Sequence, residues 1–223
     1  MRLRFGVLSC TWVHGVTRAW KLATYGVGVA LIVAALCRTH AEAQQLLLSA
    51  NLRAGGIDSR QRDQAGSRIR RSHAEVLVRS PAADVTQVLL DYAGYRRFMP
   101  NFLASRVLSR RGNQAMVYFE VSALSGLTTL WAEMQIQLLP SSDPTQVVVA
   151  RMVKGNLKGF EAAWQITPVS ATHTLVAFEL CADPDFPLPF ASGIVSDYNE
   201  KEARDSVLAL RGHMARPDRS ATR

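Results

Sequence analysis

The sequence predicts one α+β domain: a curved antiparallel sheet of about six to seven strands wrapped around a long C-terminal helix, with two short helices after the first strand. Segments of alternating polar and apolar residues follow one another at hairpin spacing between residues 72 and 181, which favours an antiparallel meander. The segment Phe190–Met214 is long, lacks proline and is apolar at helical intervals. A sheet with one apolar face must bury it, and this helix is the one predicted element long enough to cover it.

The composition is that of a globular protein. Of 223 residues, 48% are hydrophobic and 20% are charged, which excludes a disordered tail protein, a collagen-like repeat and a multi-span membrane protein. The net charge of +8 alone suggests nucleic acid or an anionic membrane surface. However, residues 1–43 hold five basic residues and one acidic residue, which leaves +4 on the rest. Six arginines cluster in 53–71 without an interleaved aromatic residue, so no stacking platform for bases and no nucleic-acid partner are expected.

The segment 1–43 predicts a signal peptide. Residues 22–36 form an uncharged, mostly apolar run that follows two basic residues and precedes the small-x-small sequence Ala41-Glu42-Ala43. This is the order of a secretory signal, and the apolar run is shorter than the ~20 residues that span a bilayer. We expect cleavage after Ala43 and an exported protein, periplasmic or extracytoplasmic. An uncleaved N-terminal anchor stays open as the alternative.

Three regions follow the predicted cleavage site. Residues 44–71 contain Gly55-Gly56 and many polar residues without sustained periodicity, which predicts a flexible basic lead-in. Residues 72–216 carry the regular patterns and form the predicted folded domain. Residues 217–223 are polar and are expected to form a disordered tail.

The regular patterns begin with a strand at His73–Arg79, where alternate residues are apolar. Ser80-Pro81 ends this strand and predicts a helix N-terminus with Ser80 as its cap. A second short helix is predicted at Tyr95–Met99 and ends before Pro100.

Six further alternating segments follow, separated by turn residues. They are Leu103–Ser109, Ala115–Ala123, Leu127–Leu139, Gln146–Lys154, Phe160–Thr167 and Thr174–Cys181. Gly155 and Gly159 are expected to supply positive φ in one hairpin turn. Alternation alone leaves open which face of each strand points inward.

The sequence carries no signature of a nucleophilic or metal-dependent enzyme. It has no GxSxG, no HExxH and no Cys–His arrangement. Two of the three cysteines lie in 1–43, which leaves Cys181 alone in the mature chain. His73, His173 and His213 are expected in surface or capping roles. We therefore expect no metal, no cofactor and no catalytic residue, although acid/base chemistry by one Tyr, Glu or Arg in a pocket stays open.

A series of short motifs runs through the predicted domain in a fixed order. They are Ser80-Pro81-Ala82-Ala83-Asp84-Val85, Leu90-Asp91-Tyr92, Phe98-Met99-Pro100, Gly155-Asn156-Leu157-Lys158-Gly159-Phe160, Trp164-Gln165-Ile166-Thr167-Pro168 and Asp183-Pro184. Their order and spacing resemble the START-like helix-grip superfamily (SRPBCC), and within it the polyketide cyclase and coenzyme Q-binding branch. The resemblance covers residues 74–214 and implies a helix-grip fold with a START-like ligand-binding domain at 72–216.

This resemblance implies that the domain binds or carries an apolar small molecule, such as a lipid or an isoprenoid quinone, between the sheet and the C-terminal helix. Binding would be driven by burial of apolar surface, at ~25 cal/mol per Å², with transient contact to a membrane surface. Two alternatives from the same superfamily stay open. One is an aromatase/cyclase acting on a polyketide-like substrate, and the other is a toxin-like, ribosome-associating interaction protein.

The candidate cavity-lining residues are large apolar and aromatic side chains of the strands and the last helix, with one arginine that interrupts an apolar strand face. They are Phe98, Phe102, Tyr118, Trp131, Met134, Arg151, Trp164, Phe178, Ile194 and Tyr198. An interior Arg151 would anchor a polar head group or a quinone oxygen. The segments Phe98–Phe102 and Pro187–Ile194 are the expected gate, because prolines and a glycine bound them.

Overall fold

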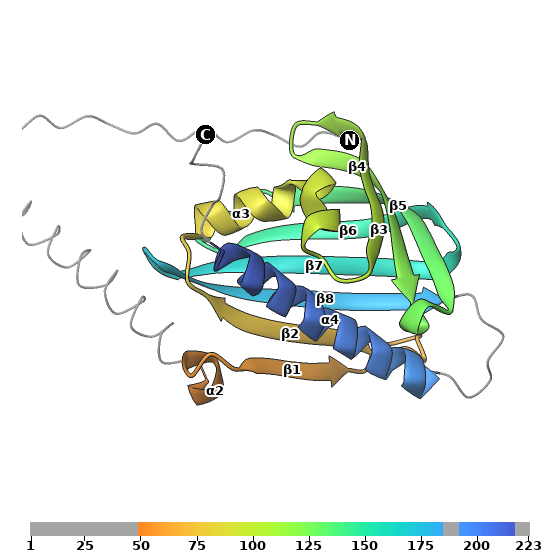
Figure 1. Cartoon of the computed structure of the whole chain (residues 1–223), viewed down its shortest axis with the longest axis horizontal. Coiled ribbons are helices and arrows are strands. Elements are labelled where there is room, and N and C mark those ends of the chain that lie inside the picture. The colour runs from red at the N-terminus through yellow and green to blue at the C-terminus, as the bar shows by residue number, and fades with distance from the viewer. Residues whose placement is uncertain (1–48, 185–191, 217–223) are drawn as a thin grey trace, which may run out of the picture. The chain divides into compact units, whose positions relative to one another are not determined.

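A computed structural model describes residues 49–184 and 192–216 of the chain (Figure 1). The predicted signal peptide, its cleavage site, the tail 217–223 and most of the gate segment Pro187–Ile194 lie outside the described residues. The described residues form one antiparallel sheet of eight strands, and helix α4 (Ser192–Met214) crosses one face of it (Figure 1). The α+β class, the curved sheet and the C-terminal helix are confirmed, whereas the count of six to seven strands was wrong.

The strands are arranged in the order β1-β2-β8-β7-β6-β5-β4-β3 across the sheet. Their bounds are β1 Ile57–Arg62, β2 Arg71–Val78, β3 Phe102–Arg111, β4 Gln114–Ala123, β5 Thr128–Leu139, β6 Gln146–Gly155, β7 Leu157–Ser170 and β8 His173–Pro184. From β3 to β8 the chain forms consecutive hairpins, and β8 then pairs with β2. The predicted strands match β2 to β8 to within three residues at each end.

The missed strand, β1, lies in the segment 44–71 that was predicted to be flexible. Its sequence, Ile-Asp-Ser-Arg-Gln-Arg, has a single apolar residue, so a search for apolar alternation cannot detect it. Polar contacts to α4 hold it in place. Ser59 Oγ donates to Glu200 at 2.7 Å, and Gln61 Nε2 donates to the same carboxylate at 2.8 Å. A short helix, α2 (Ala50–Arg53), precedes this strand.

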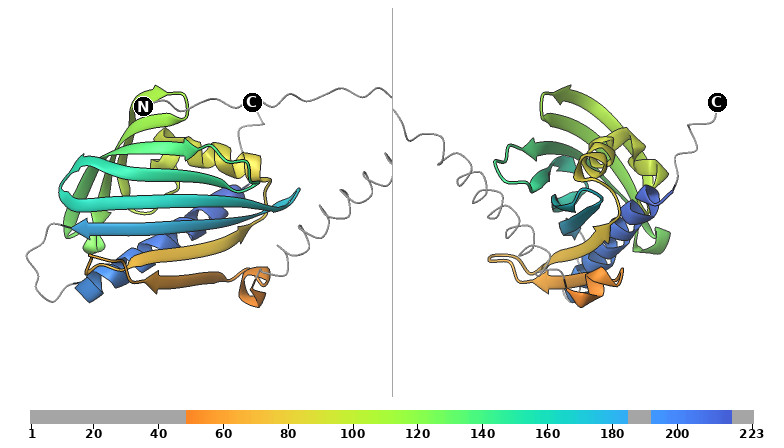
Figure 2. Two further views of the ribbon diagram at one scale, coloured as in Figure 1. Left: turned by 180° about the vertical axis from the view of Figure 1, so that it is seen from behind. Right: turned by 90° about the vertical axis from the view of Figure 1, so that its left-hand side faces the viewer.

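Two short helices connect β2 to β3, as predicted. They are α3 (Ala82–Leu90) and the 3-10 helix η1 (Tyr92–Arg97). The predicted cap was wrong, because Pro81 takes the N-cap position and the Ser80 hydroxyl donates to the carbonyl of Arg79. Both helices lie on the same side of the sheet as α4 (Figure 2), where α3 contacts β7 and β8 and η1 contacts β3.

The core lies between these helices and the inner face of the sheet. The buried inner-face residues include Ala74, Val76, Val117, Met134, Ile136, Val148, Ile166 and Val176. Helix α4 packs Ala203, Val207 and Leu210 into this core. The alternate residues of the same strands, among them Glu120, Glu133, Arg151, Glu161 and Glu179, therefore lie on the outer face. The structure thus decides which face points inward, a question that alternation left open.

Close approach of two strands explains the glycine at position 155. Neither Gly155 nor Gly159 has a positive φ, so the predicted role of these glycines was wrong. A Cβ at Gly155 would come within 2.6 Å of the carbonyl oxygen of Trp131 on β5. The register of β5 and β6 shifts nearby, between Glu133 and Met134. Glycine is therefore needed here for backbone proximity at a bulge.

Candidate functional site

A cavity of about 150 Å³ lies between the inner face of the sheet and α4. Strands β4 to β8 form its floor, α4 forms one wall, and the connection from η1 to β3 forms another. Its lining is predominantly apolar and includes Tyr95, Phe102, Phe119, Met134, Ile136, Val148, Phe160, Trp164, Phe178 and Leu180. A concave, mostly apolar space with a few polar groups is the usual form of a small-molecule site.

Six of the ten predicted lining residues border this cavity: Phe102, Trp131, Met134, Trp164, Phe178 and Tyr198. Trp164 and Phe178 are partners on β7 and β8, and their stacked ring centroids lie 4.1 Å apart. Trp131 differs from the others, because its ring stacks on Tyr118, an outer-face residue, at 6.2 Å. The aromatic floor is therefore built mainly by β7 and β8.

Two predicted lining residues lie near α4 but not on the cavity. The ring of Phe98 stacks on His213, with 4.6 Å between centroids, and so joins the end of η1 to the last turn of α4. Ile194 lies in the first turn of α4 and is 68% exposed. Neither residue borders the cavity in this structure.

The other two predicted residues lie on the outer face. Tyr118 is covered by the guanidinium of Arg106, 4.6 Å above its ring centroid. Arg151 is exposed, because the alternation of β6 turns Val148 and Ala150 toward the cavity. The interpretation of Arg151 as an interior anchor was therefore wrong.

The polar part of the cavity wall comes from α4 and was missed by sequence reasoning. Asn199, Glu202 and Ser206 border the cavity, and their spacing of three and four residues places them on one helix face. Asn199 is 2% exposed and its Nδ2 donates to the carbonyl of Ala182 at 3.0 Å. The predicted lining consisted of large apolar and aromatic side chains and one arginine, whereas polar residues at helical spacing on a core-facing helix indicate this part of the wall.

The segment predicted as a gate, Phe98–Phe102, lies at the edge of the cavity. Asn101 has a left-handed φ of 63°, and its Nδ2 donates to both carboxylate oxygens of Glu202 at 3.2 and 3.3 Å. Its carbonyl accepts from the backbone N–H of Ser122 on β4 at 2.8 Å. One residue thus links the η1–β3 connection to α4 and to the sheet.

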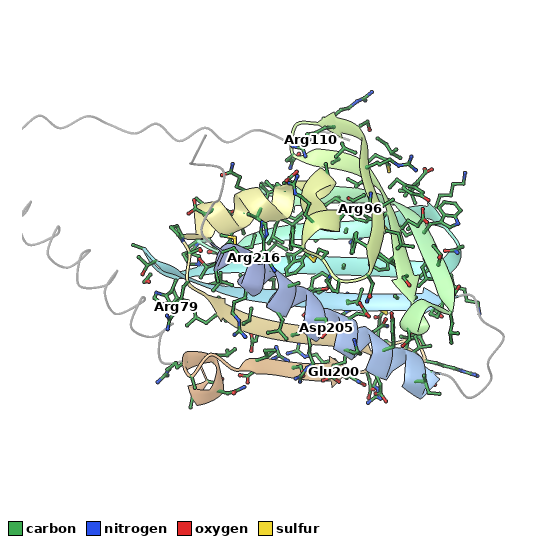
Figure 3. All side chains as sticks on the ribbon, viewed as in Figure 1. Arg79, Arg96, Arg110, Glu200, Asp205 and Arg216 are labelled. Atoms are coloured by element: carbon green, nitrogen blue, oxygen red, sulfur yellow. The ribbon has the colours of Figure 1, made fainter. Side chains whose placement is uncertain are left out.

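Ionisable groups are sparse around the cavity. Tyr95 stacks on Phe119, donates its hydroxyl to the carbonyl of Leu89 at 2.7 Å, and has its pKa raised by burial. The charged residues labelled in Figure 3 lie around α3, η1 and α4 and do not line it: Arg79, Arg96, Arg110, Glu200, Asp205 and Arg216. Among the described residues, no group of three His, Cys, Asp or Glu could hold a metal ion. No helix in the described ranges is long and apolar enough to cross a membrane.

A second polar cluster lies on the opposite face of the sheet. His73, expected at the surface or as a cap, is 4% exposed and lies between Glu75 and Glu179, at 3.5 and 3.3 Å. The hydrogen bond to His73 holds the pKa of Glu75 below its ordinary value. Because Ala74 and Val76 face the core, this cluster belongs to the outer face and not to the cavity.

Comparisons with known proteins agree with this architecture. The family model described as polyketide cyclase / dehydrase and lipid transport matches residues 78–211. A STAR-related lipid transfer protein from Xanthomonas axonopodis is similar in structure, with a TM-score of 0.64 and 23% identity over 72% of this chain and 94% of that chain.

Two further solved structures extend the likeness. The Zhui aromatase/cyclase from Streptomyces sp. R1128 gives a TM-score of 0.57 at 17% identity, covering 69% of this chain and 98% of that chain. The human StarD13 lipid transfer and protein localization domain gives 0.58 at 12% identity, covering 83% and 97%. At these identities the likeness shows the fold alone. No curated protein matches the sequence.

Proposed function

The chain belongs to the polyketide cyclase / dehydrase and lipid transport family, and we propose that it is an exported carrier of an apolar small molecule, a lipid or an isoprenoid quinone. The observation that carries the proposal is the apolar cavity beneath α4. Protein interiors leave few voids larger than a water molecule, whereas about 150 Å³ stays open against Trp164 and Phe178. Filling it with ligand removes apolar surface from water at ~25 cal/mol per Å².

The chemistry of the lining supports binding over catalysis. Within the described residues, the ionisable groups on the cavity are Tyr95, Tyr198 and Glu202. The Tyr95 hydroxyl is used by a backbone carbonyl, and Glu202 accepts from Asn101. The rest of the lining is predominantly apolar, which supports the carrier function. A cyclase-type enzyme on a polyketide-like substrate is the alternative, since Tyr198 and Glu202 could supply the proton donor or acceptor that it needs.

The exported location rests on the N-terminal sequence pattern, with a mature chain that starts at Gln44. Export also disfavours the ribosome-associating alternative, since ribosomes lie in the cytoplasm. Loading and release would take place by transient contact with a membrane surface, where apolar molecules reside.

Native mass spectrometry of the protein purified from its own host, followed by lipid extraction, tests the proposal. We expect a mass that starts at Gln44 and a co-purifying apolar molecule. Ala162→Leu on the cavity floor should carry no such molecule, whereas the matched variant Ala163→Leu, one residue along β7 on the outer face, should keep it. A wild-type protein that carries nothing and binds no member of a lipid panel would refute the carrier function. An intact N-terminus would refute cleavage after Ala43 separately and would leave the uncleaved anchor as the alternative.

A further inference from the structure

Helix α4 places Tyr198, Asn199, Glu202 and Ser206 on the wall of a predominantly apolar cavity. Asn199, Glu202 and Ser206 form one stripe along the helix, which we call the polar stripe. Buried polar groups cost free energy unless they are hydrogen-bonded. Core-facing positions of a helix are ordinarily apolar, so three polar residues in succession on this face require partners.

The protein itself uses only part of the hydrogen-bonding capacity of the stripe. The Asn199 amide nitrogen donates to Ala182, but its side-chain oxygen accepts from no described residue. Ser206 is 9% exposed, and no described residue hydrogen-bonds its hydroxyl. The Glu202 carboxylate accepts from Asn101 and retains lone pairs for a further donor. The unused groups are thus two acceptors and one hydroxyl, which can donate or accept.

These unused groups select one ligand chemistry. A ligand hydroxyl can donate to the Glu202 carboxylate or the Asn199 oxygen and accept from Ser206. A ligand carboxylate or phosphate would meet the negative charge of Glu202, and no Lys, Arg or His among the described residues lines the cavity to offset the repulsion. The stripe therefore favours a neutral hydroxyl and disfavours an anion.

The cavity is partly open, so a ligand can extend beyond the about 150 Å³ that lies beneath α4. We propose that the ligand is an uncharged apolar molecule whose hydroxyl group binds the polar stripe of α4. This inference rests on the proposed carrier function and names its ligand class.

Displacement of the neutral fluorescent dye Nile red from the purified full chain tests the inference. Decanol, decyl methyl ether and decanoate share an apolar chain and differ in the polar end. We expect decanol to displace the dye at about a tenfold lower concentration than the ether, which cannot donate a hydrogen bond, or than decanoate. Ser206→Ala removes a donor from which both the alcohol and the ether oxygen can accept, so it should weaken the binding of decanol and of the ether. Glu202→Gln should remove most of the discrimination against decanoate.

The control variant is Asp205→Asn, which makes the same charge change next to the stripe. Asp205 pairs with Lys201 on the surface of α4 (Figure 3) and does not line the cavity, so this variant should bind all three molecules like wild type. Equal displacement by the three molecules, or displacement that is unchanged for all three in both Ser206→Ala and Glu202→Gln, would overturn the polar-stripe inference while leaving the carrier function intact. A folded wild-type protein that binds neither Nile red nor any decyl compound would overturn the carrier function and this inference with it.

Discussion

The two halves of α4 meet the same sheet in different ways. In the C-terminal half, Val207 and Leu210 are completely buried, and His213 stacks on Phe98. In the N-terminal half, the residues that face the cavity are polar, and open space lies in front of them. Ser206 is the last residue of α4 that borders the cavity, and core residues lie on both sides of it, at Ala203 and Val207.

The difference indicates that apolar burial holds only one half of the helix. The N-terminal half is attached by polar contacts to the neighbouring strands instead. The Ser196 hydroxyl accepts from the backbone N–H of Arg70 at 3.0 Å, and the Ser196 carbonyl accepts from the Ser72 hydroxyl at 3.3 Å. Because these contacts do not require close packing over β4 to β7, a cavity can exist there without releasing the helix.

Truncation of the packed half should have the largest effect. Leu210→Ala removes a side chain with no exposed surface and should lower the free energy of unfolding by about 2–5 kcal/mol. Urea denaturation measures this loss. Leu208→Ala, on the same helix but 36% exposed, is the matched control and should cost less than ~1 kcal/mol. Similar losses in the two variants would contradict the claim that burial in this half holds α4 on the sheet.

Enlargement of small residues should have the next largest effect, and it separates a packed position of α4 from the cavity. Ala203→Leu adds volume at a position with no exposed surface outside the cavity, so overpacking should cost about 1–3 kcal/mol. Ala162→Leu adds the same atoms toward the cavity and should leave the free energy of unfolding unchanged or raise it. Thermal unfolding of the ligand-free proteins compares them. A large loss in Ala162→Leu would show that the cavity is not available space.

Substitutions of Asn101, at the edge of the cavity, should have a smaller effect on stability. Asn101→Gly keeps the left-handed backbone without strain and removes the hydrogen bond to Glu202. We expect a loss below ~1.5 kcal/mol in the free energy of unfolding and faster release of Nile red in stopped-flow fluorescence. Asn101→Ala, which adds the strain of a Cβ at φ 63°, should be less stable than Asn101→Gly by about 1 kcal/mol. Unchanged release in both variants would argue against a gate at this connection.

The sequence predicted most of this fold because its strands alternate strongly. The hairpins from β3 to β8 and the helix Ser192–Met214 carry patterns that a search for apolar periodicity detects. Strand β1 escaped because its neighbours stabilise it through polar side chains such as Ser59 and Gln61, which resemble those of a loop. The role of Gly155 could not be predicted either, since it depends on a carbonyl of Trp131 more than twenty residues earlier.

The site was harder to predict than the fold, because alternation identifies two faces without saying which one is covered. Residues of the inward face, such as Met134 and Trp164, reached the cavity. Tyr118 and Arg151 are of residue types that often contact ligands. Each lies one residue along its strand from an inward-facing position and therefore points to the outer face. The polar stripe shows the converse error, since Asn199 and Ser206 resemble surface residues until α4 is placed on the sheet. Knowing which face α4 covers would have corrected both errors.

Substitutions on the outer face of the sheet should have the smallest effect, because they should leave both halves of α4 unaffected. The hydrogen bond from His73, aided by Arg60 at 3.5 Å, holds the pKa of Glu75 below its ordinary value of 4.5 in the folded protein. A lowered folded pKa gives a contribution to stability that is present above the unfolded pKa and is lost as the pH falls through the folded pKa.

Glu75→Gln should therefore be less stable than wild type at neutral pH, and the difference should shrink as the pH falls below 4.5. Urea denaturation of the wild type and the variant across this pH range measures it. Nile red binding at neutral pH should be the same in both proteins. A loss of binding in Glu75→Gln would mean that the outer face and the cavity are coupled through β2 and β8, and the contrast within α4 would then no longer account for ligand binding by itself.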